Sequence, residues 1–316
     1  MFKNRKGLFV FSDPGGAKPI LSFVYNNNIN NYKIISDRKY DFYSDFNLEV
    51  NSFFDQNEEE LLHEFKPDYL FTGTSYTSNI ELRFIRAAKK IGLTCYSYID
   101  HYTNYIERFS LNDELYFPDK IFLVDNFAKE IAVKNNISAH SKLEVSGNFY
   151  HKFLKDWIPK TSRENLINNY KISFNEKIIV FAPDPLSNIN GKEKFLFDEV
   201  DVWNDFVSAI EKIKTNDFLV IIKFHPNQDI KSFSKIINKS SLSNIFYYEN
   251  NSIDLLYHAD IVVGIFSSIL IEANVFKKKI IRHIPASPMK DPLLALGIGL
   301  VSKNKRELCE NLILTL

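Results

Sequence analysis

The stretch that decides the fold is residues 261–273, with the sequence IVVGIFSSILIEA. Its first residues have the length and β-branched composition of a buried strand, and an apolar helical pattern begins after Ser267 and Ser268. This order predicts a strand, a short loop and a helix, which together form one βα unit. In such units the helix N-terminus lies at the sheet edge where open α/β sheets bind ligands.

The same alternation of short apolar runs and helical patterns extends through all 316 residues. Runs of strand length occur at 8–11, 33–35, 69–71, 94–99, 121–124 and 143–145, and again at 178–181, 218–222, 245–248, 261–263 and 279–281. Strands separated by helices predict right-handed crossovers and parallel sheets. The polar stretch 152–175 is the expected boundary. We therefore expect two doubly wound, Rossmann-like α/β domains, 1–155 and 156–316, that face a cleft.

Composition excludes several classes of protein. Lys and Arg total 39 and Asp and Glu total 39, so no net positive charge is available to bind nucleic acid. The two cysteines predict neither a disulfide framework nor a metal site, and the seven histidines are scattered. Signal-peptide and membrane-span patterns are absent. We expect a cytoplasmic protein without a metal; the 28 Phe and 16 Tyr leave room for peripheral contact with the inner membrane surface.

Two motifs of the second domain predict a phosphate site, whereas the GxGxxG and Walker lysine patterns are absent. In residues 223–227, KFHPN, His225 follows a buried strand and can donate a hydrogen bond to phosphate, while Pro226 turns the chain. Ser267 and Ser268 begin a helix whose N–H groups suit an anion, although Ser267 can equally be a plain N-cap. Glu272 can bind ribose hydroxyls or be a surface or salt-bridged residue.

This pair of motifs resembles the HP and SS/ST motifs of bacterial sialyltransferases and Kdo-type transferases. The resemblance implies the GT-B fold, a CMP-activated nonulosonic acid as donor, and inverting transfer without a metal. It implies that His225, Ser267 and Ser268 bind the nucleotide phosphate. The family's motif of two acidic residues followed by glycine is not present in this sequence, so the resemblance does not identify the catalytic base.

The sequence is more distantly similar to the teichoic-acid polymerases that use CDP-glycerol. That family carries a Trp-His-Gly base motif, and residues 98–102, YIDHY, stand in the comparable place, where only His101 matches. The later stretch 146–150, SGNFY, stands in the position of that family's Gly-Tyr-Pro turn. The resemblance implies that Asn148 approaches the nucleotide.

The first domain is expected to bind the acceptor. Asp13 follows the first strand, and Gly15 and Gly16 allow the backbone to come close to a ligand. Asp13 is a candidate for the base that removes the acceptor proton, although it can also simply cap the next helix. Asp100 and His101 end the fourth strand, where they can act as a general base or form a buried hydrogen-bonded pair.

Two further loop residues have both a functional and a structural interpretation. Thr74 lies in a hydroxyl-rich loop that can contact sugar hydroxyls or form a simple turn. Asp184 lies between two prolines after the first strand of the second domain, where it can orient the donor or form a turn.

These observations predict an inverting, metal-independent glycosyltransferase. Its donor would be a CMP-activated sialic, pseudaminic, legionaminic or Kdo-type sugar, and its acceptor a surface glycan or a lipid-linked precursor, as in capsule or lipopolysaccharide synthesis. No cofactor is expected. The alternatives are a CDP-glycerol or CDP-ribitol phosphotransferase, a UDP-sugar enzyme of the GT-B type (a transferase or a nonhydrolysing epimerase), and a binding module without turnover.

Overall fold

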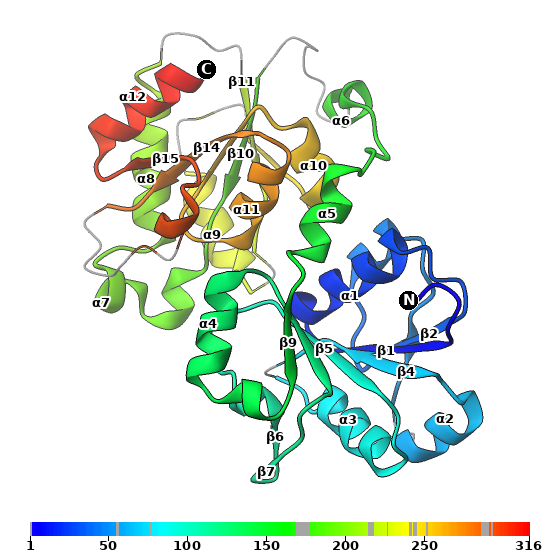
Figure 1. The fold of residues 1–316 in the computed structure, drawn as a ribbon. Coiled ribbons are helices and arrows are strands. Elements are labelled where there is room, and N and C mark those ends of the chain that lie inside the picture. The colour runs from blue at the N-terminus through cyan, green and yellow to red at the C-terminus, as the bar shows by residue number, and fades with distance from the viewer. Residues whose placement is uncertain are drawn as a thin grey trace. The chain divides into compact units, whose positions relative to one another are not determined.

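A computed structural model describes residues 2–54, 57–75, 77–168, 177–213, 218–225, 227–239, 242, 245–250, 252–285, 291 and 293–316. The chain divides into two compact units, Met1–Asp156 and Trp157–Leu316. Each unit is built on a parallel sheet covered by helices (Figure 1). Pro226 lies outside the described residues.

Unit 1 contains a seven-stranded parallel sheet in the order β3-β2-β1-β4-β5-β8-β9. The strands are β1 (Gly7–Phe11), β2 (Tyr32–Ser36), β3 (Asn51–Ser52), β4 (Tyr69–Thr72), β5 (Cys95–Ile99), β8 (Lys120–Leu123) and β9 (Lys142–Val145). The helices are α1 (Pro14–Asn26), α2 (Glu58–Phe65), α3 (Ile80–Lys90), α4 (Asn126–Lys134) and α5 (Phe149–Lys155), with 3₁₀ turns η1 (Asp41–Asp45), η2 (Glu107–Phe109) and η3 (Ile137–Ala139). A small hairpin pairs β6 (Ser110–Leu111) with β7 (Glu114–Leu115).

Unit 2 contains a six-stranded parallel sheet in the order β12-β11-β10-β13-β14-β15. The strands are β10 (Lys177–Ala182), β11 (Phe218–Ile222), β12 (Ile245–Tyr247), β13 (Ile261–Gly264), β14 (Lys279–His283) and β15 (Leu300–Ser302). The helices are α6 (Arg163–Asn168), α7 (Gly191–Phe195), α8 (Glu199–Ile210), α9 (Ile230–Ile237), α10 (Ser252–His258), α11 (Ser268–Val275) and α12 (Lys305–Thr315), with 3₁₀ turns η4 (Leu186–Ile189) and η5 (Leu294–Leu296).

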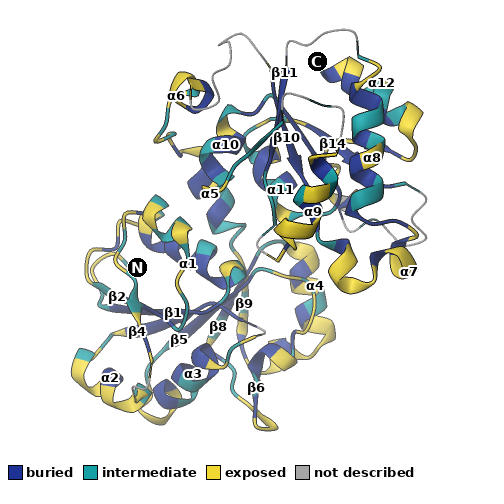
Figure 2. Cartoon of the chain, turned by 180° about the vertical axis from the view of Figure 1, so that it is seen from behind, coloured by how far each residue is buried: buried dark blue, intermediate teal, exposed yellow. Residues whose placement is uncertain are grey.

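Burial explains why the strand patterns could be detected in the sequence. Strands such as β1, β5 and β11 are buried along their whole length, because helices cover the parallel sheets (Figure 2). Their sequences are therefore continuous apolar runs. The outer faces of the helices are exposed (Figure 2). The predicted fold class, two parallel doubly wound α/β sheets, is confirmed; the short edge strand β15 was not predicted from the sequence.

In each sheet the order in which strands are added reverses at the first strand, so that later strands lie on both sides of it. In unit 1 β2 follows on one side of β1 and β4 on the other, and in unit 2 β11 and β13 flank β10 in the same way. The loops that leave such a pair of strands diverge, which creates the ligand-binding position of open α/β sheets. The loops after β1, β4, β10 and β13 are therefore the places to look for a site.

In unit 1 two glycines, one after β4 and one in α1, bring the backbones of these two segments into direct contact. A Cβ atom on Gly73, after β4, would lie 2.9 Å from the Cα atom of Gly16 in the first turn of α1. The Gly16 atom belongs to the backbone, so it cannot move aside as the end of a flexible side chain could. Glycine at residue 73 thus permits the start of α1 to pack directly on the β4 loop.

We expect Gly73→Ala to destabilise the protein by about 1–3 kcal/mol, because the added methyl group overpacks a backbone contact. Gly92→Ala is the control: its Cβ would meet nothing within 4 Å, but its φ of +70° costs about 1 kcal/mol for a residue with a side chain. Urea unfolding of the two variants measures both effects. A Gly73→Ala protein as stable as the wild type would contradict the packing described.

Candidate functional site

Three loops of unit 2 leave neighbouring strands at one sheet edge. His225 follows β11, Asp184 follows β10 and Ser267 follows β13, and these strands are adjacent in the order β11-β10-β13. All pairs are parallel, so the three carboxyl ends lie at the same edge. The two predicted phosphate motifs are thus brought to one edge, with one strand between them.

The imidazole of His225 is oriented by its own loop. The N–H of Asn227 donates to His225 Nδ1 over 3.1 Å, so the neutral ring carries its proton on Nε2. The side chain is half-buried, and burial lowers its pKa below the ordinary value. At neutral pH this residue is therefore an uncharged ring that offers one N–H donor from Nε2.

The N-terminus of α11 has the features of an anion site. Ser267 occupies the N-cap position, but its side chain makes no capping hydrogen bond, and the first turn contains no acidic residue. Ser268 is exposed. The helix dipole and the first-turn N–H groups are accordingly not offset by a local carboxylate in that turn. Ser267 is therefore the N-cap residue by position, but its hydroxyl does not accept an N–H group of the first turn.

Asp184 holds the turn that leads into α11. Its Oδ2 atom accepts the N–H of Phe266 at 2.8 Å. Burial raises the pKa of the carboxyl to about 6, although hydrogen bonds from the N–H groups of Phe266, Ser267 and Ile265 oppose the rise. The side chain therefore fixes the approach to the α11 N-terminus.

A buried carboxylate that the sequence did not reveal links two of the loops. Glu199, at the start of α8, accepts hydrogen bonds from Ser187 N at 2.9 Å, Ser187 Oγ at 2.5 Å and Gln228 Nε2 at 2.9 Å. It thereby joins the loop after β10 to the loop that carries His225. Nothing local distinguishes Glu199 from an ordinary first-turn glutamate, so only the tertiary contacts identify it. Glu272 on α11 is also buried, which excludes its interpretation as an exposed residue.

In unit 1 the predicted residues also gather at one edge. Asp13, Thr74 and Asp100 follow the adjacent strands β1, β4 and β5. Asp13 Oδ1 accepts the N–H of Gly16 at 3.0 Å, so this side chain caps α1. A Cβ on Gly15 would collide with Asp100 Oδ2. The close approaches at Gly15 and Gly16 are thus made by the chain itself.

Asp100 is a partly exposed acid of this edge, as is Asp13. The Asp100 side chain is 24% exposed and its Oδ1 atom lies 3.9 Å from Nη1 of the buried Arg108. Burial raises its pKa, Arg108 and His101 lower it, and Asp13 raises it further. Arg108 donates to the carbonyl oxygens of Thr74 and Thr103, so the cation is fixed behind Asp100.

The remaining predicted residues make local contacts. His101 is exposed, and its Nδ1 atom lies 2.9 Å from Thr103 Oγ1, so it does not form the buried pair considered for it. The buried Thr74 donates its hydroxyl to the carbonyl of Tyr98. Asn148 caps α5 by accepting N–H groups of that helix's first turn. Each of these side chains therefore has a structural partner.

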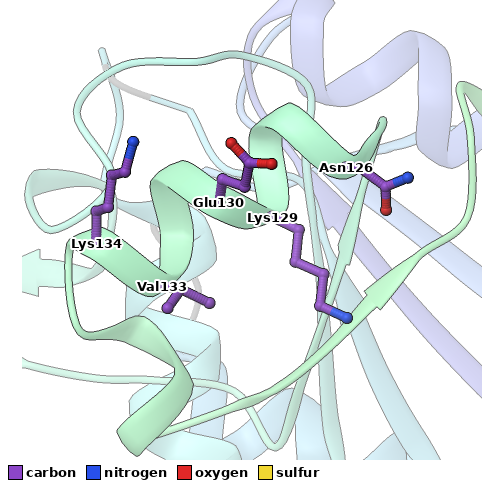
Figure 3. Close-up of a pocket in the computed structure, with 5 residues that line it drawn as sticks. All are labelled: Asn126, Lys129, Glu130, Val133 and Lys134. Atoms are coloured by element: carbon purple, nitrogen blue, oxygen red, sulfur yellow. The ribbon is translucent and has the colours of Figure 1, made fainter.

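A shallow surface pocket lies elsewhere, along α4. It is lined by Asn126, Lys129, Glu130, Val133 and Lys134, which project from one helix (Figure 3). None of them belongs to the strand-end loops described above. Over the described ranges, no group of three or more His, Cys, Asp or Glu side chains is placed to hold a metal ion. Among the same residues, no helix is both long and apolar enough to cross a bilayer.

Comparison with known proteins identifies the fold. No family model and no curated protein sequence matches this chain. A UDP-GlcNAc 2-epimerase from Methanocaldococcus jannaschii is similar in structure, with a TM-score of 0.70 and 16% identity over 98% of this chain and 92% of that one. The Neisseria meningitidis UDP-GlcNAc 2-epimerase bound to UDP-GlcNAc has a TM-score of 0.64 and 15% identity, covering 98% and 90%.

A transferase shares the same architecture. The glycotransferase of kitacinnamycin has a TM-score of 0.57 and 10% identity, covering 99% of this chain and 91% of that one. Together with the two parallel sheets of this chain, these likenesses confirm the predicted GT-B fold. At these identities the likeness establishes the fold alone.

We expect Asp184→Asn to remove a pH dependence of stability. The folded-state pKa of about 6 lies above the ordinary 3.8, so the folded protein retains a proton that the unfolded chain loses. Wild-type stability should therefore fall by about 2.4 kcal/mol relative to the Asn variant as pH rises from 4 to 7.

Urea unfolding of both proteins across this pH range measures that difference. Asp113→Asn, at an exposed loop residue of unit 1, serves as the control. A stability difference between wild type and Asp184→Asn that stays constant with pH would show that Asp184 does not titrate in this way.

Proposed function

We propose that this protein is an enzyme that uses a nucleoside-diphosphate sugar, with a UDP-sugar as the first choice, and that the diphosphate binds at the strand-end edge of unit 2. The observation that carries the proposal is the arrangement of the His225 Nε2 donor and the α11 N-terminus on either side of β10. An N–H donor and a helix N-terminus at one edge form an anion site. The structural neighbours crystallised with UDP or UDP-GlcNAc support the same choice.

The structural neighbours crystallised with UDP or with UDP-GlcNAc favour a nucleoside diphosphate over a nucleoside monophosphate. The CMP-activated donor predicted from the sequence resemblance has one phosphate and is thus the weaker candidate.

The proposed reaction is transfer of the sugar to an acceptor hydroxyl. The bond between the anomeric carbon and the diphosphate oxygen breaks as the acceptor oxygen attacks, and the acceptor proton passes to a base. Asp100 is the proposed base, because it is partly exposed and Arg108 stabilises its carboxylate. His225 and the α11 N-terminus would stabilise the charge that develops on the departing UDP, an effect commonly worth several kcal/mol.

A second candidate is epimerisation of the sugar of UDP-GlcNAc at C2. The observation that favours it is structural: the M. jannaschii and N. meningitidis epimerases match nearly the whole chain. The two activities share the nucleotide site proposed for unit 2. They differ in whether an acceptor is consumed.

We expect His225→Ala to weaken UDP binding by about 10- to 100-fold and Ser267→Ala by about 5- to 10-fold, because each loses one hydrogen bond to phosphate. Isothermal titration calorimetry with UDP and with CMP measures these effects. His63→Ala, on the exposed face of α2, is the matched control and should bind as the wild type does. UDP should bind at least about tenfold more tightly than CMP. Equal binding of UDP by His225→Ala and wild type would refute the proposed phosphate site; tighter binding of CMP would restore the CMP-sugar assignment.

A time course by proton and phosphorus NMR separates transfer from epimerisation. With UDP-GlcNAc alone, a transferase leaves the sugar unchanged, and UDP appears only after a suitable acceptor is added. An epimerase produces the C2 epimer without an acceptor. Release of neither product, with UDP-GlcNAc or with other UDP-sugars across an acceptor panel, would contradict enzymatic use of such a donor and favour a binding module.

A further inference from the structure

A buried carboxylate on α3 contacts the loops after β1 and β4, the first of which carries Asp13. Glu81 is only 3% exposed. Its Oε1 atom accepts the N–H of Ser12 at 3.1 Å, the N–H of Ser75 at 3.2 Å and the hydroxyl of Ser75. Ser12 belongs to the turn after β1 and Ser75 to the loop after β4. One oxygen atom therefore ties these two loops together.

The network extends from Glu81 to both acids. Ser75 Oγ accepts the N–H of Asp13 at 3.0 Å, which fixes the residue that caps α1. On the other side, the carbonyl of Thr74 accepts a hydrogen bond from Arg108, the cation beside Asp100. Residues 74 and 75 thus lie between the two acids, and Glu81 holds them in place.

The second carboxyl oxygen of Glu81 makes both its ionised and its protonated state costly. Its Oε2 atom is buried and has no hydrogen-bond partner among the described residues. When the carboxyl is ionised, a buried charge lacks a donor at Oε2; when it is protonated, a buried O–H lacks an acceptor. Both states carry a desolvation cost, so neither is strongly preferred at neutral pH. Burial, the largest cause, raises the pKa of Glu81 to about 7, and Asp13 adds to the rise.

Few other titratable groups face Glu81. Asp13 approaches from the β1–α1 turn, and the described β4 loop, residues 73–75, contains no charged side chain. Beneath α3, β1 and β6 carry no titratable side chain, β4 carries Tyr69, and β5 carries Cys95, Tyr96 and Tyr98, which are uncharged at neutral pH. From α2, Glu58 pairs with Arg83 of α3. Protonation of Glu81 is therefore set mainly by its own burial, which raises its pKa, and by hydrogen bonds such as that from Ser75, which lower it; Asp13 adds a smaller rise.

We infer that Glu81 is a positioning residue of the proposed enzyme: its carboxylate holds the Asp13 turn and the Thr74–Ser75 loop in the arrangement that presents Asp100, and protonation weakens that hold. Hydrogen bonds to an ionised carboxylate are roughly twice as strong as those to a neutral carboxyl. Loss of the charge therefore loosens three hydrogen bonds at once. The inference rests on the proposed function for its kinetic readout, whereas the structural link itself can be tested without turnover.

The decisive experiment compares the pH profiles of kcat and of KM for wild type, Glu81→Gln and Ser75→Ala. In the wild type, kcat should fall as pH drops through about 7. Glu81→Gln, which cannot ionise, should lose this step and have a kcat at pH 8 at least about tenfold lower, because a 1 Å displacement of reacting groups can cost more than that. KM for the nucleotide sugar should change less than twofold, since that substrate is proposed to bind unit 2. Glu64→Gln, at an exposed residue of α2, is the matched control.

Ser75→Ala keeps the Glu81 carboxylate and removes the hydroxyl that donates to it. This variant should have a lower kcat, and the fall of kcat with pH should remain but occur at a different pH. It replaces Glu81→Gln as the test if that variant does not fold. Unchanged kcat and an unchanged pH step in Glu81→Gln would overturn the inference, as would equal effects of Glu81→Gln and Glu64→Gln. A large increase in KM alone would equally contradict a role confined to unit 1.

Hydrogen exchange separates failure of this inference from failure of the proposed function. In Glu81→Gln, the amides of residues 12–16 and 72–75 should exchange faster than in the wild type, whether or not turnover is found. A wild type without turnover would refute the proposed reaction, while unchanged exchange in the variant would refute the structural role of Glu81.

Discussion

The candidate sites depend on hydrogen bonds that strand-end loops donate to buried carboxylates. A parallel sheet places strand ends at one edge, but the loops that leave those ends need separate restraint. Asp184 supplies it for the turn before α11, Glu199 for the loop after β10 and the His225 loop, and Glu81 for the loops after β1 and β4. Without these contacts the edge would lack a defined geometry.

The two edges differ in the groups that their loops present. Neither α1 nor α11 has an acidic residue in its first turn, and one carboxyl group accepts backbone N–H groups at each start: Asp13 at α1 and Asp184 at α11. Unit 1 adds a second acid, Asp100, whereas unit 2 adds the neutral imidazole donor of His225. An N–H donor beside a helix N-terminus suits an anionic diphosphate, and a partly exposed carboxylate suits a group that gives up a proton.

Much of this arrangement was predictable because it follows from backbone periodicity. Apolar runs indicated the buried parallel strands, and the polar residues after them, such as Asp13, Asp100 and His225, were placed at strand ends that share one edge in each unit. Local patterns could not indicate the partners of those residues. Glu81 and Glu199 look like ordinary first-turn glutamates, and they are distinguished only by loops brought to them from elsewhere in the sheet. Gly73 likewise looks like an ordinary loop glycine, and only its contact with Gly16 shows why a side chain does not fit there.

The central claim is that the His225 imidazole and the N-terminus of α11 together bind the diphosphate of a nucleotide. Its most direct test is a titration of isotope-labelled protein with UDP, followed by the NMR signals of the His225 ring and of the backbone amides of Ser268 and Ile269. If the diphosphate binds there, these signals should shift together and reach saturation at one common UDP concentration. Saturable UDP binding that leaves them unmoved, while signals elsewhere in the chain shift, would contradict it.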